Sequence, residues 1–95
     1  MDDHLFTLNG DERWLIRFTH LKGDAYGITY TRKAARPRIV IHDGLRGRHR
    51  LTVLIHELLH AIFPQASEDV VEQAGKDLAR VLWTLYDIKP KEDEA

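Results

Sequence analysis

The sequence predicts a small α+β domain in which a small, mostly antiparallel sheet precedes a buried helix and a second helix. In the first half of the 95-residue chain, short runs rich in β-branched and aromatic residues alternate with turn-forming clusters, which is typical of strands. From Leu51 onward, apolar residues recur at helical spacing instead. The length suits a single domain spanning residues 1–95.

Four runs are the expected strands. Turn-forming clusters around Gly10 and Gly23 separate the first three runs, and a third cluster at Gly44 follows the fourth. Pro37 suits the first position of the last strand. The expected strands cover residues 5–8, 14–18, 26–31 and 38–42.

The first expected helix, at 51–62, is apolar almost all round, which is typical of a helix buried at the centre of a domain. The few polar residues of this segment are regularly spaced. Thr52, His56 and His60 recur at every fourth residue and so form one line along the helix, with Glu57 beside them. A buried helix is therefore expected to carry one polar stripe.

The second expected helix begins after Ser67, a favourable N-cap, and runs to about residue 86. The short loop between the helices predicts that they lie roughly antiparallel, as a hairpin. Residues from about 88 to 95 are expected to form a flexible acidic tail. The face expected to pack inward comprises Val71, Ala74, Leu78, Val81, Leu82 and Leu85.

The amino-acid composition restricts which metal ligands, cellular location and partners we expect. Without cysteine the chain has no thiolate ligand or nucleophile, so a metal must be held by nitrogen and oxygen. The acidic start does not resemble a signal peptide, and no apolar run has the roughly 20 residues of a membrane span, so we expect a cytoplasmic protein without a membrane partner. Several arginines cluster between 32 and 50 against a net charge of -1. We interpret these arginines as solvated surface residues rather than as a nucleic-acid-binding site, because no aromatic residues are interspersed among them.

The histidine stripe points to metal chemistry. Zinc takes neutral imidazole nitrogens at about 2 Å, and two histidines four residues apart on a helix project to the same side. His56 and His60 meet this requirement. Glu57, offset by about 100° on the helix, is placed to act as general base toward a water molecule. The sequence therefore predicts a zinc site with Glu57 as its catalytic residue.

The third ligand is expected from the second helix. Glu68 and Glu72 lie one turn apart, and Gly75 and Ala79 continue their line, where small residues would let the two helix backbones approach closely. On a helical wheel Glu68 lies nearer the apolar face, whereas a symmetric hairpin would favour a residue near 72. We favour Glu68 as the ligand, with Glu72 as the hydrogen-bond acceptor of a ligand histidine or as the alternative ligand.

The segments 38–41, 54–61 and 67–72 together resemble the gluzincin metallopeptidases, and within them the minigluzincins and related small phage-borne or bacterial proteins. The resemblance covers about half of the chain. It implies a minimal zincin-like fold in which a glutamate on the second helix is the third ligand and an acidic residue four positions later supports a histidine, matching Glu68 and Glu72. It also implies that the strand at 38–42 lines the substrate cleft.

Other polar residues are weaker candidates for stabilising an oxyanion. His49 lies on the histidine face if the first helix extends that far, but we favour its interpretation as an ordinary surface histidine. No spacing selects among the remaining candidates, and the two tryptophans are expected to pack in or beside the core. These candidates are His20, His42, Tyr26, Tyr30 and Tyr86.

The expected activity is hydrolysis of a peptide or protein substrate by metal-activated water, with Zn²⁺ as the cofactor. Two other functions stay open. One is a catalytically silent zinc-binding structural or regulatory module. The other is a nucleic-acid-binding protein in which the metal only supports the fold.

Overall fold

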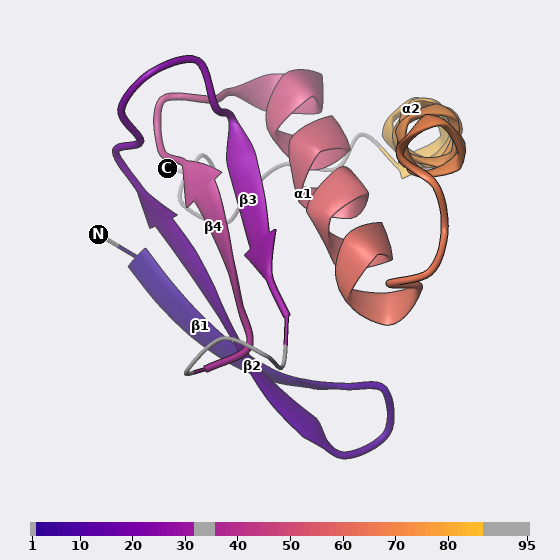
Figure 1. Cartoon of the computed structure of the whole chain (residues 1–95). Coiled ribbons are helices and arrows are strands. Elements are labelled where there is room, and N and C mark those ends of the chain that lie inside the picture. The colour runs from indigo at the N-terminus through magenta and orange to yellow at the C-terminus, as the bar shows by residue number, and fades with distance from the viewer. Residues whose placement is uncertain (1, 32–35, 87–95) are drawn as a thin grey trace.

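The computed structural model describes residues 2–31 and 36–86, and within them a four-stranded sheet precedes two helices (Figure 1). The predicted α+β class and its order of strands and helices are confirmed. The predicted acidic tail at 88–95 lies outside the described residues. The elements are β1 (Asp2–Leu8), β2 (Glu12–Thr19), β3 (Gly27–Tyr30), β4 (Arg38–His42), α1 (Gly47–Ile62) and α2 (Glu68–Tyr86).

The sheet has two antiparallel strand pairs and one parallel pair, so it is mostly antiparallel, as predicted, and the parallel pairing of β2 with β4 is the feature that the sequence did not predict. Its strand order is β1-β2-β4-β3, with β4 parallel to β2 and antiparallel to β3. The reason lies in β4, where Ile39, Val40 and Ile41 are all buried. A strand that is apolar on both faces belongs inside a sheet, so β4 takes the position beside β2 and leaves β3 at the edge.

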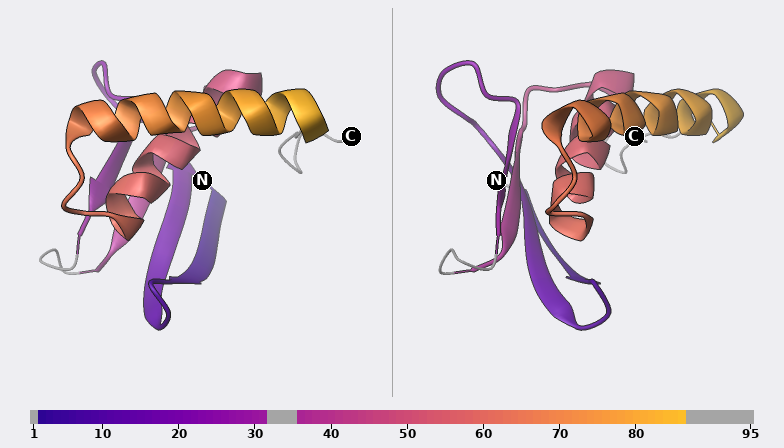
Figure 2. Two further views of the ribbon diagram at one scale, coloured as in Figure 1. Left: turned by 90° about the vertical axis from the view of Figure 1, so that its right-hand side faces the viewer. Right: turned by 45° about the vertical axis from the view of Figure 1, so that its right-hand side comes forward.

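The molecule has three layers: the sheet, then α1, then α2 on the far side of α1 (Figure 2). Helix α1 packs against β3 and β4, and its sheet-facing side chains Val53, Leu54 and Leu58 contact the main core. This core confirms that Trp14 is a packing residue. It comprises Trp14, Ile16, Phe18, Ile39, Ile41, Leu45 and Ala61.

The two helices cross obliquely, which corrects the prediction of an antiparallel hairpin. Figure 1 shows α2 end-on while α1 lies lengthwise, and Figure 2 shows their axes crossing. Val71, Gly75 and Ala79 form the buried face of α2 at this crossing. Within the described residues, neither helix is both long and apolar enough to cross a membrane.

The predicted inward face of α2 is therefore only partly correct. Val71 is buried, but Leu78 and Val81 are 44% and 47% exposed, and Leu85 is more exposed still. The helix turns its line of small residues, rather than its line of leucines, toward α1. This orientation of α2 brings its first residue, Glu68, to the interface between the two helices.

Candidate metal centre

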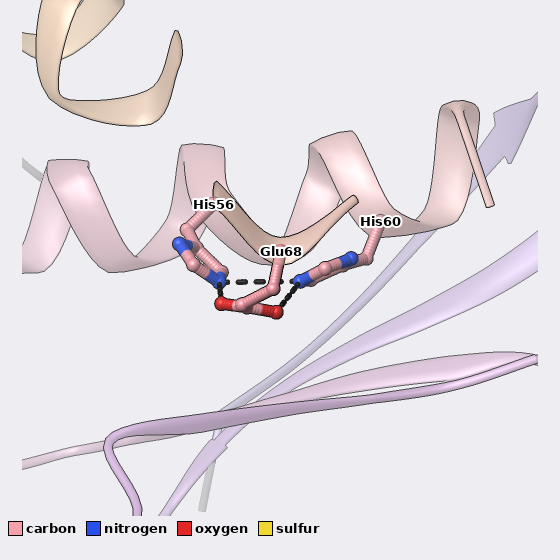
Figure 3. A group of neighbouring side chains, drawn as sticks. All are labelled: His56, His60 and Glu68. Carbon is pink, nitrogen blue, oxygen red and sulfur yellow. Dashed lines mark hydrogen bonds and ion pairs between the residues drawn. The ribbon is translucent and has the colours of Figure 1, made fainter. Parts of the chain in front are cut away.

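Helix α1 places His56 and His60 one turn apart on its α2-facing side (Figure 3). Their Nε2 atoms are 3.2 Å apart, and the two rings meet edge to face with centroids separated by 4.9 Å. The i,i+4 spacing brings the side chains together because α1 is regular through this turn. Both side chains keep about a fifth to a quarter of their surface exposed, at 20% and 24%.

Glu68 reaches these rings from the start of α2. Its Oε1 lies 2.8 Å from Nε2 of His56, and its Oε2 lies 2.8 Å from Nε2 of His60. The predicted N-cap fixes this position, because Ser67 Oγ accepts a hydrogen bond from the backbone N–H of Val70 at 3.3 Å. The cap starts α2 where the Glu68 carboxylate can bridge the two imidazoles.

Small residues on α2 permit this approach, as predicted. Gly75 is buried against α1, and a Cβ atom built on it would lie 3.5 Å from Cα of His56. Ala79, one turn further along, is fully buried. The backbone of α2 therefore passes directly over the residue that carries the first imidazole.

These three side chains form a group that could hold a metal ion. Ligand atoms of His56, His60 and Glu68 all lie within 4.8 Å of one another. In a tetrahedral site with metal–nitrogen bonds of about 2.0–2.1 Å, neighbouring ligand atoms are roughly 3.3 Å apart, and the Nε2 pair is at 3.2 Å. The Glu68 side chain is 63% exposed, so the group opens to solvent on the α2 side.

Glu57 lies beside this group but belongs to the core side of α1. It is buried, with 8% of its surface exposed, and its Oε2 is 4.0 Å from Nε2 of His56. Its Oε1 accepts a hydrogen bond of 2.8 Å from the hydroxyl of Thr29 on β3. Glu57 is therefore a buried, hydrogen-bonded carboxylate beside the His56 imidazole rather than a solvated surface charge.

A cavity of about 360 Å³ adjoins the site. His56 and Glu57 form one part of its wall, and the rings of Tyr26 and His49 form another, meeting edge to face at 4.9 Å. Of the weaker candidates, the structure thus brings Tyr26 and His49 to the site. The remaining lining residues are Gly27, Thr52, Val53, Glu72 and Lys76.

A larger cavity of about 620 Å³ lies between the end of α1 and the first turns of α2. Its walls are mainly apolar, including Leu59, Ile62, Phe63 and Val70, and it contains neither the imidazoles nor Glu57. Of these two cavities, the smaller one is lined by a candidate ligand, His56, together with Glu57.

Two expectations about the site differ from the contacts of the described residues. Glu72 does not support a histidine: its Oε1 pairs with Nζ of Lys76 at 3.2 Å, because its place on α2 turns it toward the cavity instead. Strand β4 contributes no residue to this cavity, which instead meets the start of edge strand β3, at Gly27, and the preceding Tyr26.

The other candidate residues lie away from the cavity. His20 and His42 form a pair of their own with ring centroids 5.2 Å apart, and the His42 Nδ1 accepts a hydrogen bond from the backbone N–H of Gly44. Tyr30 packs under the guanidinium of Arg38. Tyr86 is exposed at the last position of α2.

Sequence reasoning missed Thr29 and Gly27, which surround Glu57. Side chains two residues apart on a strand point to the same face, so the sequence of β3 could have shown that these two residues share a face. The sequence does not reveal which helix that face meets.

No protein-family model matches the chain, and neither the curated proteins nor the solved structures contain a match to it. The functional argument therefore depends on the residues of the site itself.

Proposed function

We propose that this chain is a zinc-dependent metallopeptidase of the zincin type that hydrolyses peptide bonds. The observation that carries the proposal is the convergence of His56, His60 and Glu68, with the buried Glu57 carboxylate at 4.0 Å from one of the imidazoles. A purely structural metal site has no need for a buried base next to its ligands. The adjoining cavity, which His56 and Glu57 line, would give a substrate access to these two side chains.

The roles of the residues follow from their atoms. His56, His60 and Glu68 would hold the ion. A zinc ion there would polarise the scissile carbonyl and activate a water molecule. Glu57 accepts the proton of the attacking water and delivers it to the leaving amine, so it ends the reaction as the carboxylate with which it began.

Tyr26 and His49 supply the electrophilic side of the cavity. Both carry a hydrogen-bond donor, and both lie in the wall that also contains Glu57. A donor aimed at the developing oxyanion lowers the barrier because it requires little reorganisation during the reaction. We expect one of these two side chains to contact the substrate carbonyl oxygen.

The decisive experiment is Glu57→Gln, assayed for zinc content and for cleavage of a fluorescence-quenched peptide library. We expect zinc binding to be retained and hydrolysis to fall by at least the roughly 10²–10⁴-fold that a general base supplies. The protein should be purified without a metal-affinity tag, so that its zinc content reports the site. Undiminished cleavage by this variant would contradict the assigned role.

The metal half of the experiment compares two glutamates on the same helix. Glu68→Gln should weaken zinc binding by more than the roughly 10–100-fold that loss of a supporting residue costs. Glu72→Gln is the matched control and should leave zinc affinity nearly unchanged, because its carboxylate contacts Lys76. The reverse result would make Glu72 the third ligand.

Two outcomes would favour the other functions. Tight zinc binding without cleavage of any library peptide would indicate a catalytically silent structural or regulatory module. Strongly salt-dependent binding of DNA or RNA would indicate that the arginine-rich segment contacts nucleic acid.

A further inference from the structure

The edge strand β3 supplies the surroundings of Glu57, and this arrangement carries an inference that rests on the proposed function. Glu57 is one of two buried charged residues among those described, the other being Arg50. A carboxylate removed from water requires hydrogen-bond donors in compensation. The donor that reaches Oε1 is the hydroxyl of Thr29, at 2.8 Å.

The Thr29 hydroxyl carries one proton and has two acceptors within reach. Besides Oε1 of Glu57, the backbone carbonyl oxygen of Glu57 lies 3.0 Å from Oγ1. Hydrogen bonds to an ionised acceptor are shorter and stronger than those to a neutral one, so the carboxylate is the favoured acceptor. Both acceptors belong to the same residue, and either contact ties β3 to this turn of α1.

Gly27 makes room for the rest of the Glu57 side chain. It precedes Thr29 by two residues and shares its face of β3. A Cβ atom at position 27 would lie 2.9 Å from Cγ of Glu57 and 3.0 Å from Cγ1 of Val53, closer than packed carbon atoms tolerate. One face of β3 therefore leaves space for the Glu57 side chain at Gly27 and hydrogen-bonds the Glu57 carboxylate at Thr29.

The two oxygens of Glu57 consequently have different surroundings. Oε1 accepts the hydrogen bond from Thr29, whereas Oε2 is the oxygen that lies 4.0 Å from Nε2 of His56. We propose that Thr29 is a positioning residue that fixes Oε1 and so holds Oε2 toward the metal-binding imidazoles as the proton-accepting atom. The Thr29 proton stays on its hydroxyl throughout, and Oε2 alone gains and releases a proton.

The test compares Thr29→Val, which replaces the hydroxyl with a methyl group, and Thr29→Ser, which keeps the hydroxyl. On the library peptide that the wild type cleaves fastest, we expect Thr29→Val to lower kcat by about 10–100-fold, the usual effect of losing a supporting hydrogen bond. KM and the zinc dissociation constant, measured by competition with a chromogenic chelator, should stay near the wild-type values. Thr29→Ser should restore most of kcat.

Two further variants serve as controls. Thr29→Ala removes the hydroxyl without adding a methyl group in its place, so it should reproduce the loss if Thr29→Val folds poorly. Thr7→Val is the matched control, because Thr7 is an exposed strand threonine on β1. It should leave kcat unchanged.

A measurement independent of activity tests the hydrogen bond itself. In zinc-free protein, the ¹³C resonance of the Glu57 carboxyl carbon, assigned by its loss in Glu57→Gln, should shift in Thr29→Val and stay in place in Thr29→Ser. An unshifted resonance, or a wild-type kcat in both hydroxyl-free variants, would overturn the inference. Absence of hydrolysis by zinc-loaded wild-type protein would instead reject the proposed function, so the two failures are read from different measurements.

Discussion

The two sides of α1 are packed in opposite ways. Toward the sheet, the helix presents Val53, Leu54 and Leu58 to a core of large apolar side chains. Toward α2, it presents His56 and His60 to a carboxylate and to the buried small residues Gly75 and Ala79. Burial of apolar side chains holds α1 against the sheet. The opposite side of α1 can therefore carry the two histidines where α1 contacts α2.

Glu57 lies at the boundary between these two sides. Its carboxylate reaches Thr29 in the sheet layer and lies 4.0 Å from His56 of the polar side. The sheet therefore does more than support α1, because its edge strand β3 also holds the carboxylate to which we assign proton transfer.

The largest effect is expected on the sheet side. Ile39 is fully buried in the core, so Ile39→Ala should lower the free energy of unfolding by about 2–5 kcal/mol, as truncations of buried aliphatic side chains do. Chemical denaturation measures this change. The control is Leu85→Ala on exposed α2 surface, expected to change stability by no more than about 0.5 kcal/mol. Comparable losses in the two variants would contradict the assignment of the core.

An intermediate effect is expected on the α2 side, from two substitutions of Gly75. A Cβ atom there makes an ordinary contact of 3.5 Å with His56, so Gly75→Ala should raise stability by about 0.5–1 kcal/mol through better helix propensity. Gly75→Leu should cost about 1–3 kcal/mol by overpacking and should weaken zinc binding by separating the helices. Thermal denaturation and zinc titration measure both. Wild-type zinc affinity in Gly75→Leu would show that close backbone contact is not required.

The smallest effect is expected on the sheet face away from α1. There Arg17 Nε donates to Oδ1 of Asp3 at 2.8 Å, and this hydrogen bond lowers the pKa of Asp3 below its ordinary 3.8. A lowered carboxyl pKa favours the folded state above the ordinary value, and the contribution disappears as pH falls through the lowered value. Because the pair is exposed and screened, Arg17→Leu should raise the pKa of Asp3 in an NMR titration while leaving zinc affinity and neutral-pH stability unchanged. A loss of zinc affinity would show that the two faces of the sheet are coupled.

The local features of this protein were predictable from its sequence. The period-four line of Thr52, His56 and His60 depends only on the geometry of one helix, and it placed the paired imidazoles correctly. Ser67 as N-cap and small residues at the helix–helix contact followed from equally local chemistry. The strand runs were also found, because alternation and turn residues act over a few positions.

The order of the strands, the crossing of the helices and the partner of Glu57 were decided by tertiary structure. Hydrophobic periodicity shows which face of a segment is buried, but it does not specify which segment covers that face. The sequence predicted a strand at 38–42 without its position in the sheet, and only the assembled sheet placed β4 beside β2 and β3 at the edge beside α1. Likewise, small residues were expected at the contact with α1, but the crossing of the two helices decided that Leu78, Val81 and Leu85, which were expected to pack inward, stay exposed.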